Sequence, residues 1–255
     1  MEKHVFSTPF GEAWLWGETP EGERPLVLSI DGAFAIERPR SFELAGYLPE
    51  AAVLNAHLPG NHCPEPVSQS VGVYAALYGE VLRQIGRPAV VVGASVGALV
   101  ALGLHQPLVK GLVVVEPPLL TGKIWPLVAS LRGWLARHPD DAERRAFIWN
   151  VLGVSEDAHE NRDYRGLLDQ LRVPTWAMFG AEPLGALRAY DVMPSLVDDP
   201  ERALLRAHPL VQTREVDGVG HNVTGRGVAF VRTCTRDLLN RLFGTEIPAA
   251  NREAS

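Results

Sequence analysis

Residues 88–104 read Pro-Ala-Val-Val-Val-Gly-Ala-Ser-Val-Gly-Ala-Leu-Val-Ala-Leu-Gly-Leu, and no other segment says as much about the architecture. The first five residues are apolar and mostly β-branched, which predicts a buried strand, and the last seven are small and apolar, which predicts a helix packed on a sheet. Between them, Gly93 and Gly97 flank Ser95 in a Gly-x-Ser-x-Gly pattern at a strand-to-helix junction. The pattern predicts a strained turn that presents the Ser95 hydroxyl above the sheet as a nucleophile. The alternative is a tight structural turn that happens to carry a serine.

Length and composition restrict the classes of protein that remain. The 255 residues are 46% hydrophobic and 21% charged, which is ordinary for a globular α/β protein. A formal net charge of −6 without a Lys/Arg run argues against nucleic acid as a partner. The N-terminus does not resemble a signal peptide, no apolar run approaches the ~18 residues of a membrane span, and two cysteines make no disulfide framework. We therefore expect a cytoplasmic monomer or homodimer that acts on a small molecule, with no membrane partner.

Predicted strands and helices alternate along the chain. Strands are expected in a hairpin from Val5 to Trp16 and at residues 25–30, 51–55, 88–92, 111–115, 173–179 and 211–216. Helices are expected from Pro66 to Ile85 and from Gly227 to Phe243, where apolar residues recur at helical spacing. This alternation predicts a mostly parallel sheet that is covered by helices on both faces.

The segment between Leu119 and Gln170 interrupts the alternation, because its pattern is helical and contains no strand. It also holds Trp125, Trp134 and Trp149. These tryptophans are expected either to form the core of an extra helical layer or to line a substrate pocket on the underside of a lid.

With these features the chain resembles the α/β-hydrolase family from about Val5 to Phe243. The resemblance implies an eight-stranded, mostly parallel sheet whose second strand is antiparallel. It implies a core of residues 1–118 and 171–255, with a small helical cap at 119–170 inserted after the sixth strand. It also implies a catalytic triad in the chain order nucleophile, acid, histidine.

The histidine of the triad is expected at His221. It lies in the glycine-rich run Asp217-Gly-Val-Gly-His221, after the last predicted strand and before the final helix. A serine hydroxyl reacts only when a base at hydrogen-bond distance takes its proton. The alternative is a surface loop histidine.

The acid of the triad is harder to place. The family acid usually lies three residues after a glycine at the end of the seventh strand, but here the third residue after Gly180 is Pro183. Glu182, one residue earlier and with one more methylene of reach, is the first choice to hold the imidazole. Glu116, at the end of the preceding strand, is the second choice, and Asp191 is a distant third.

Backbone amides of Ala33 and Val96 are expected to form an oxyanion hole, because backbone donors do not depend on side-chain identity. The family commonly has His-Gly where this chain has Asp31-Gly32. A carboxylate near a developing negative charge is unfavourable, so we expect Asp31 to point away and bind backbone groups. Phe34 follows in this loop and is expected to contact substrate.

His57, His62 and Cys63 are residue types that bind metals, but no fourth ligand follows at a recognised spacing, so neither metal nor cofactor is expected. The resemblance therefore implies a serine hydrolase that cleaves a carboxylic ester of a small to medium, moderately apolar acyl substrate. Thioesterases, lactonases, amidases and acyltransferases use the same groups. A second hypothesis, motivated by the irregular acid and by Asp31, is a ligand-binding relative with weak catalysis.

Overall fold

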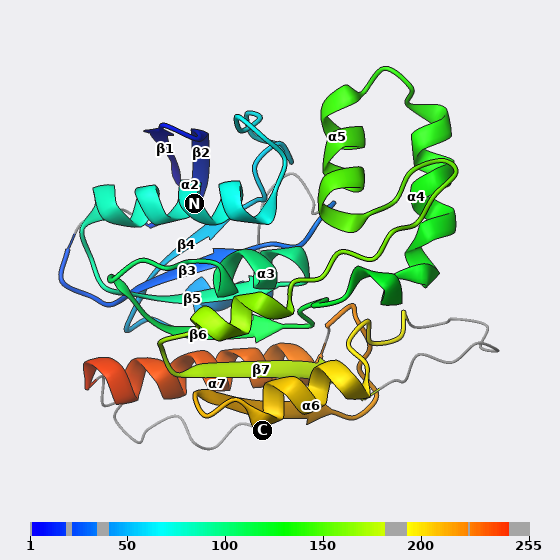
Figure 1. Ribbon diagram of the computed structural model, residues 1–255. Helices are drawn as coiled ribbons and strands as arrows, with labels where there is room; N and C mark the ends of the chain where they lie inside the picture. The colour runs from blue at the N-terminus through cyan, green and yellow to red at the C-terminus, as the bar shows by residue number, and fades with distance from the viewer. Residues whose placement is uncertain (1, 19–21, 35–40, 182–192, 224, 245–255) are drawn as a thin grey trace.

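The computed structural model describes residues 2–18, 22–34, 41–181, 193–223 and 225–244. These residues form one sheet of eight strands in the order β1-β2-β4-β3-β5-β6-β7-β8 (Figure 1). The strands are β1 (Glu2–Thr8), β2 (Gly11–Gly17), β3 (Leu26–Ile30), β4 (Ala52–Ala56), β5 (Ala89–Ala94), β6 (Val109–Val115), β7 (Thr175–Gly180) and β8 (Val211–Val216). Strand β2 is antiparallel to β1 and β4, and the pairs from β4 to β8 are parallel. The predicted fold class is confirmed.

The central strands are apolar throughout because both of their faces are buried. In β6, Leu112 and Val114 belong to the larger hydrophobic cluster, whereas Val113 and Val115 belong to the smaller one. Successive side chains of a strand point to opposite faces, so a strand covered on both sides needs apolar residues at every position. This is the physical basis of the continuous β-branched runs in the sequence.

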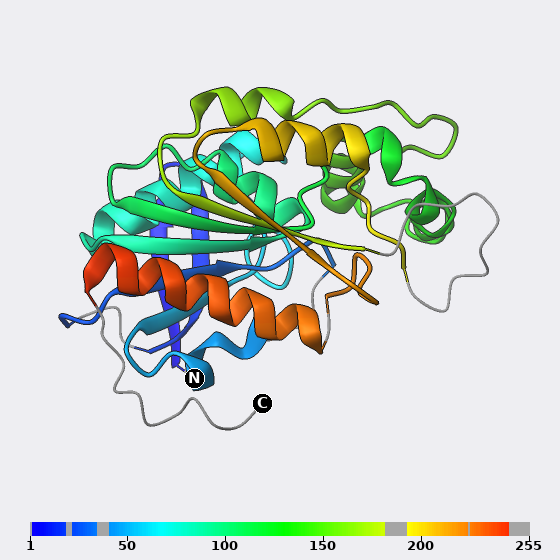
Figure 2. The same ribbon diagram turned by 90° about the horizontal axis from the view of Figure 1, so that it is seen from below.

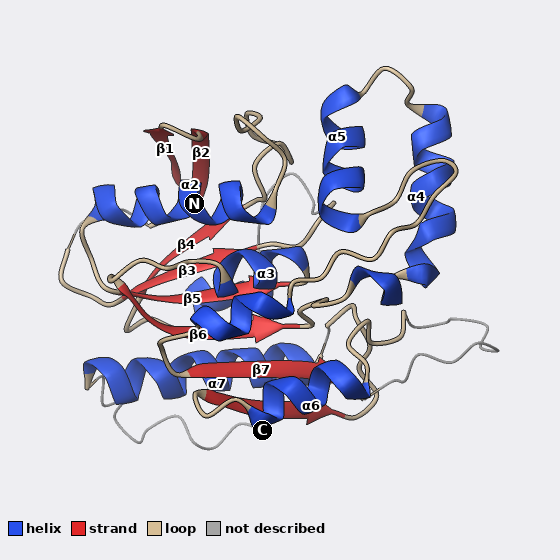
Figure 3. Ribbon diagram, in the orientation of Figure 1, coloured by secondary structure: helices blue, strands red, loops and turns tan. Residues whose placement is uncertain are grey.

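Helices cover the two faces of the sheet (Figures 2 and 3). Helices α2 (Val71–Ile85) and α3 (Val96–Leu102) pack on one face, and α1 (Leu44–Tyr47) and α7 (Arg226–Phe243) pack on the other. Helix α6 (Asp199–Ala207) contacts β8. Among the described residues, no helix combines the length and the apolar character that a membrane span requires.

Helix α2 begins five residues later than predicted. The hydroxyl of Ser70 accepts a hydrogen bond from the amide of Val73 at 3.2 Å and caps the helix. Val67 lies outside the helix, its amide bonded to the carbonyl of Phe10 at 2.9 Å and its residue 69% exposed. The apolar spacing of Val67 was therefore misleading, because the cap at Ser70 determines where the helix starts.

Between β6 and β7 the chain forms α4 (Trp125–Arg137) and α5 (Ala142–Phe147), which continues into a π-helical turn at Ile148–Leu152. These helices stand beyond the carboxyl ends of the parallel strands (Figure 3). A 3₁₀ turn at Arg165–Gln170 lies back against α3. An isolated bridge joins Leu120 to Asp163 and connects the start of this insertion to its later part. A second isolated bridge joins Val154 to His159.

Candidate active site

Ser95 occupies a sharp turn between β5 and α3, with φ 53° and ψ −120°. A Cβ on Gly93 would lie 2.3 Å from the carbonyl oxygen of Gly97. A Cβ on Gly97 would lie 2.5 Å from the carbonyl oxygens of Ile30 and Asp31. Both distances are shorter than any real Cβ contact, so the two flanking positions accept only glycine. The positive φ at serine is a strained conformation that the surrounding backbone holds in place.

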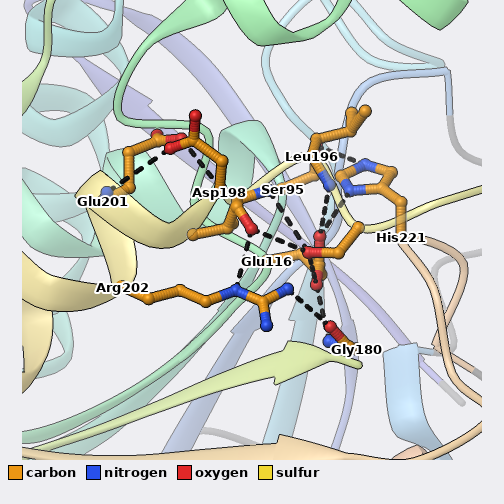
Figure 4. A network of polar contacts seen from close by, with 10 residues as sticks. Ser95, Glu116, Gly180, Leu196, Asp198, Glu201, Arg202 and His221 are labelled. Atoms are coloured by element: carbon orange, nitrogen blue, oxygen red, sulfur yellow. Dashed lines mark hydrogen bonds and ion pairs between the residues drawn. The ribbon is translucent and has the colours of Figure 1, made fainter. Parts of the chain in front are cut away.

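His221 lies in the loop between β8 and α7, and its Nε2 is 3.1 Å from Oγ of Ser95 (Figure 4). The amide of His221 donates to the carbonyl of Met193 at 3.0 Å, which fixes the loop against the segment before α6. Gly180 makes room for this loop, because a Cβ there would lie 2.0 Å from the carbonyl oxygen of Val219. The imidazole is thus held within hydrogen-bond distance of the serine hydroxyl.

Glu116 directly follows β6 and has a positive φ of 51°. Its carboxylate is fully buried, and its Oε2 lies 3.2 Å from Nδ1 of His221. Oε2 also accepts from the amide of Leu196 at 3.0 Å, and Oε1 accepts from the amide of Gly180 at 2.7 Å and the hydroxyl of Ser195 at 2.8 Å (Figure 4). A buried carboxylate is costly unless its oxygens accept hydrogen bonds, and these donors satisfy both oxygens of Glu116.

The structure therefore brings Ser95, His221 and Glu116 into one chain of polar contacts. Glu182 and Asp191 lie outside the described residues. Sheet topology explains the place of Glu116. Strands β5 and β6 are parallel neighbours, with Ala94 paired to Val115, so the residue after each strand emerges at the same edge.

Arg202 and Ser195 support the carboxylate of Glu116, and no sequence pattern indicated either residue. Arg202 comes from α6, is 6% exposed, and donates to the carbonyl of Gly180 at 2.8 Å and that of Val197 at 2.9 Å. These bonds hold the end of β7 beside the segment that carries Ser195. A sequence signal for α6 did exist, because Asp198 and Glu201 form a capping box at its start. No local pattern indicates where the arginine points.

Ala33 and Val96 both line the cavity that Ser95 also lines. Within the described part of the chain, neither of their backbone amides donates a hydrogen bond to another group. A Cβ on Gly32 would lie 3.2 Å from Cβ of Ser95, so this loop passes close to the serine. Both amides are therefore available as donors to an oxygen bound beside Ser95.

A cavity of about 440 Å³ opens above Ser95. Ser95, Glu116 and His221 form part of its lining, and Phe34 lies on the loop at one side. The remaining wall is largely aliphatic and includes Ile124, Leu127, Leu152, Met193, Leu196, Val223 and Val228. The helices between β6 and β7 thus contribute an apolar part of the cavity.

The three tryptophans predicted to bind substrate are not among the residues that line this cavity. Trp134 stacks on His138 with ring centroids 4.3 Å apart, and Trp149 packs under the guanidinium of Arg162 at 4.7 Å. Trp125 is 41% exposed on α4. The rings of Trp134 and Trp149 pack against His138 and Arg162, and smaller aliphatic residues line the cavity. Phe34 does line it.

Asp31 and His57 form a buried pair beside the cavity, with 3.9 Å between Oδ2 and Nδ1. The rings of His57 and His62 lie 5.3 Å apart. Burial raises the pKa of the Cys63 thiol to about 11. The described residues contain no group of three or more His, Cys, Asp or Glu placed to hold a metal ion.

Residues 14–233 match the model of the alpha/beta hydrolase family. The chain belongs to that family. Among solved structures, this alpha/beta hydrolase is similar to a thermophilic esterase from Thermogutta terrifontis, with 18% identity, a TM-score of 0.64, and 94% of this chain and 99% of that chain covered. It is similar to a putative hydrolase from Bacillus subtilis, with 18% identity, a TM-score of 0.65, and 94% and 92% covered.

An N-acyl homoserine lactonase, AidH, solved with N-hexanoyl homoserine, is 16% identical, with a TM-score of 0.63 and 97% and 99% covered. At these identities the likeness concerns the fold alone. No curated sequence matches the chain.

Proposed function

We propose that this alpha/beta hydrolase is a serine hydrolase that cleaves a carboxylic ester through an acyl-enzyme intermediate. Family membership supports a hydrolase. The observation that carries the finer proposal is the chain of contacts from Ser95 Oγ to His221 Nε2 at 3.1 Å and from His221 Nδ1 to Glu116 Oε2 at 3.2 Å. A hydroxyl, an imidazole and a carboxylate in this order activate a serine for acyl transfer.

In the first half-reaction, Oγ of Ser95 attacks the carbonyl carbon of the ester while Nε2 of His221 takes its proton. The carboxylate of Glu116 fixes the tautomer with the proton on Nδ1 and stabilises the imidazolium that forms. The amides of Ala33 and Val96 donate to the developing oxyanion. In other enzymes the loss of one such donor costs roughly 3–4 kcal/mol of transition-state stabilisation. The imidazolium then returns the proton to the departing alcohol, and an acyl-serine remains.

In the second half-reaction, water takes the place of the alcohol. His221 removes a proton from the water, which attacks the acyl carbon, and the tetrahedral intermediate collapses to release the carboxylic acid. The proton returns to Oγ of Ser95. The reaction consumes one water and needs no metal or cofactor.

The shape and polarity of the cavity support a small to medium, moderately apolar substrate. Its volume of about 440 Å³ is in the range of small-molecule pockets, and its aliphatic wall favours apolar groups. The structural neighbours include proteins named as an esterase, a lactonase and a thioesterase. Lactones and thioesters use the same nucleophile and base, so they are the alternative substrates to test beside esters.

A panel of p-nitrophenyl esters of increasing acyl length, beside a thioester and a lactone, tests the proposal. We expect the wild type to hydrolyse short and medium esters, and Ser95→Ala and His221→Ala to lose that activity while they stay folded. Absence of hydrolysis by folded wild-type protein would support a ligand-binding relative. A thioester or lactone turned over far faster than any ester would change the substrate class and leave the mechanism intact.

A further inference from the structure

A second, narrow pocket opens beside the catalytic cavity. It lies between the loop that follows β4 and helix α5, and it shares Ala33 and Phe34 with the wall of the catalytic cavity. Its other lining residues are Leu58, Pro59, Gly60, Asn61, Glu65, Gln69, Glu143, Arg144 and Phe147. The side pocket has a volume of about 20 Å³, which is enough for about one water-sized group. The side pocket and the catalytic cavity are therefore neighbours that share the loop of Ala33 and Phe34.

The loop that carries Asn61 is fixed by its own hydrogen bonds. The amide of Asn61 donates to the carbonyl of Leu58 at 2.9 Å, and the amide of Gly60 donates to that of Pro64 at 3.1 Å. The hydroxyl of Tyr78, which is fully buried, donates to the carbonyl of His57. The backbone of Asn61, a residue that lines the side pocket, is thus held by an ordered turn.

The side-chain nitrogen of Asn61 is buried and has no hydrogen-bond partner within the described part of the chain, and the residue is only 8% exposed. Gln69, in the same wall, is different. Its Nε2 donates to Glu65 and its Oε1 accepts from the hydroxyl of Tyr74. A buried, unpaired amide donor is costly and rare in folded proteins. The carboxamide nitrogen of Asn61 therefore has no acceptor among the residues that the structure describes, and a bound ligand could supply one.

The charges around the side pocket select against an anion. Glu65 and Glu143 both line it, and Arg144 is the cation of the wall, so the formal balance is negative. Burial and then the charge of Glu143 raise the pKa of the Glu65 carboxyl. A carboxylate placed here would meet two acidic side chains. An uncharged oxygen would meet the donor of Asn61.

We propose that the side pocket is a substrate subsite in which Nδ2 of Asn61 donates a hydrogen bond to an uncharged oxygen of the substrate, a carbonyl above all. This inference rests on the proposed function, because the subsite shares Ala33 and Phe34 with the cavity that Ser95 lines. It narrows the substrate class to esters with an apolar portion for the aliphatic cavity and a neutral carbonyl oxygen near the scissile bond. Asn61 is a specificity residue in this account and takes no part in the chemical steps.

The test compares substrates of matched size. The acyl series consists of three p-nitrophenyl esters. Pentanoate is the alkyl reference, levulinate carries an added ketone, and succinate carries an added carboxylate. The alcohol series consists of propyl acetate and acetonyl acetate. Each is measured as kcat/KM with wild type, Asn61→Ala, Asn61→Asp and Asn240→Ala, an amide truncation on the exposed face of α7. Ketone esters are intrinsically more reactive than alkyl esters. The decisive quantity is therefore the kcat/KM of the ketone ester divided by that of the alkyl ester, compared between wild type and variant.

In one of the two series, Asn61→Ala is expected to lower the ketone-to-alkyl ratio by about three- to tenfold, the range of one net hydrogen bond, with little change on the alkyl ester. Asn61→Asp is expected to lower it at least as much, because an acceptor replaces the donor, and Asn240→Ala is expected to leave it unchanged. Succinate is expected to be the poorest acyl ester for the wild type.

Equal ratios for wild type and Asn61→Ala in both series would overturn the subsite and would indicate that the side pocket holds a water. If the alkyl ester is still hydrolysed in a Ser95-dependent way, the proposed function survives that result. If no ester is turned over, the same ratios are measured as dissociation constants of the intact esters. A ketone preference that Asn61→Ala removes would then support the subsite, and its absence would reject it.

Discussion

The carboxylate of Glu116 lies 3.2 Å from Nδ1 of His221, although the two residues are 105 positions apart in the chain. The contact joins the end of β6 to the loop after β8, across β7. It exists because Gly180, at the end of β7, leaves space for the histidine loop and donates its own amide to Glu116. One glycine thus helps to position both His221 and Glu116.

Glu116→Gln is expected to lower kcat by about a thousandfold or more, because the amide no longer enforces the tautomer of His221 or stabilises its imidazolium. The measurement is steady-state kinetics on a short p-nitrophenyl ester, with circular dichroism to confirm folding. Glu182→Gln is the matched control and is expected to retain most activity. The opposite order, with Glu182→Gln the more damaging change, would return the acid role to Glu182.

Gly97→Ala is expected to lower the free energy of unfolding by about 2–4 kcal/mol, because the added Cβ meets two backbone carbonyl oxygens at 2.5 Å and the backbone cannot move away cheaply. Gly72→Ala in α2 is the control. No atom lies within 4 Å of the added Cβ there, and the helix gains up to about 1 kcal/mol. Urea denaturation measures both, and equal effects at the two sites would reject the steric account of the turn.

Glu201 makes stability depend on pH. Burial raises the pKa of its carboxyl from 4.5 to about 7, although it accepts from the amides of Leu120 at 2.9 Å and Asp198 at 3.2 Å. At pH values between the unfolded-state pKa of 4.5 and the folded-state pKa of about 7, the folded state binds more protons than the unfolded state. The free energy of unfolding therefore falls as pH rises through this range. The shift corresponds to a loss of about 3 kcal/mol over that window.

The measurement is the free energy of unfolding in urea at pH values below 4.5 and above 7. Glu201→Gln is expected to flatten the decline, whereas Asp199→Asn, an exposed carboxylate on the same turn, is expected to leave it unchanged. A decline of the same size in Glu201→Gln would assign the pH dependence to other groups.

Leu127→Ala is expected to lower kcat/KM for longer acyl chains by about tenfold and to change short-chain hydrolysis little, because an aliphatic wall of the cavity is lost. Trp125→Ala, two residues away and exposed on α4, is expected to have no such effect. A larger loss from Trp125→Ala would restore the tryptophans to the substrate site and would contradict the cavity described above.

The sequence predicted the fold because its signals are local, and local patterns also made Ser95 and His221 the candidate nucleophile and base. Continuous apolar runs follow from strands buried on both faces, and the two glycines follow from backbone contacts at the Ser95 turn. The ranking of the carboxylates was a different matter. The position of Glu116 beside Ser95 depends on β5 and β6 being parallel neighbours in register, which no residue count along the chain contains.

The tryptophans show the same limit in the segment between β6 and β7. Composition indicated an aromatic insertion, but which face of α4 and of the following turn points to the cavity depends on how the helices pack. The ring of Trp134 stacks on His138, and the ring of Trp149 contacts the guanidinium of Arg162. Arg202 and Ser195 act through contacts between distant segments, so sequence spacing gave no indication of them.

The most direct test of the central claim is covalent labelling with a fluorophosphonate, which reacts only with a serine that an adjacent base activates. Intact mass and peptide mapping are expected to show one adduct on Ser95 of the wild type, none on Ser95→Ala, and much slower labelling of His221→Ala. No adduct on folded wild-type protein, or an adduct that persists in Ser95→Ala, would contradict the account.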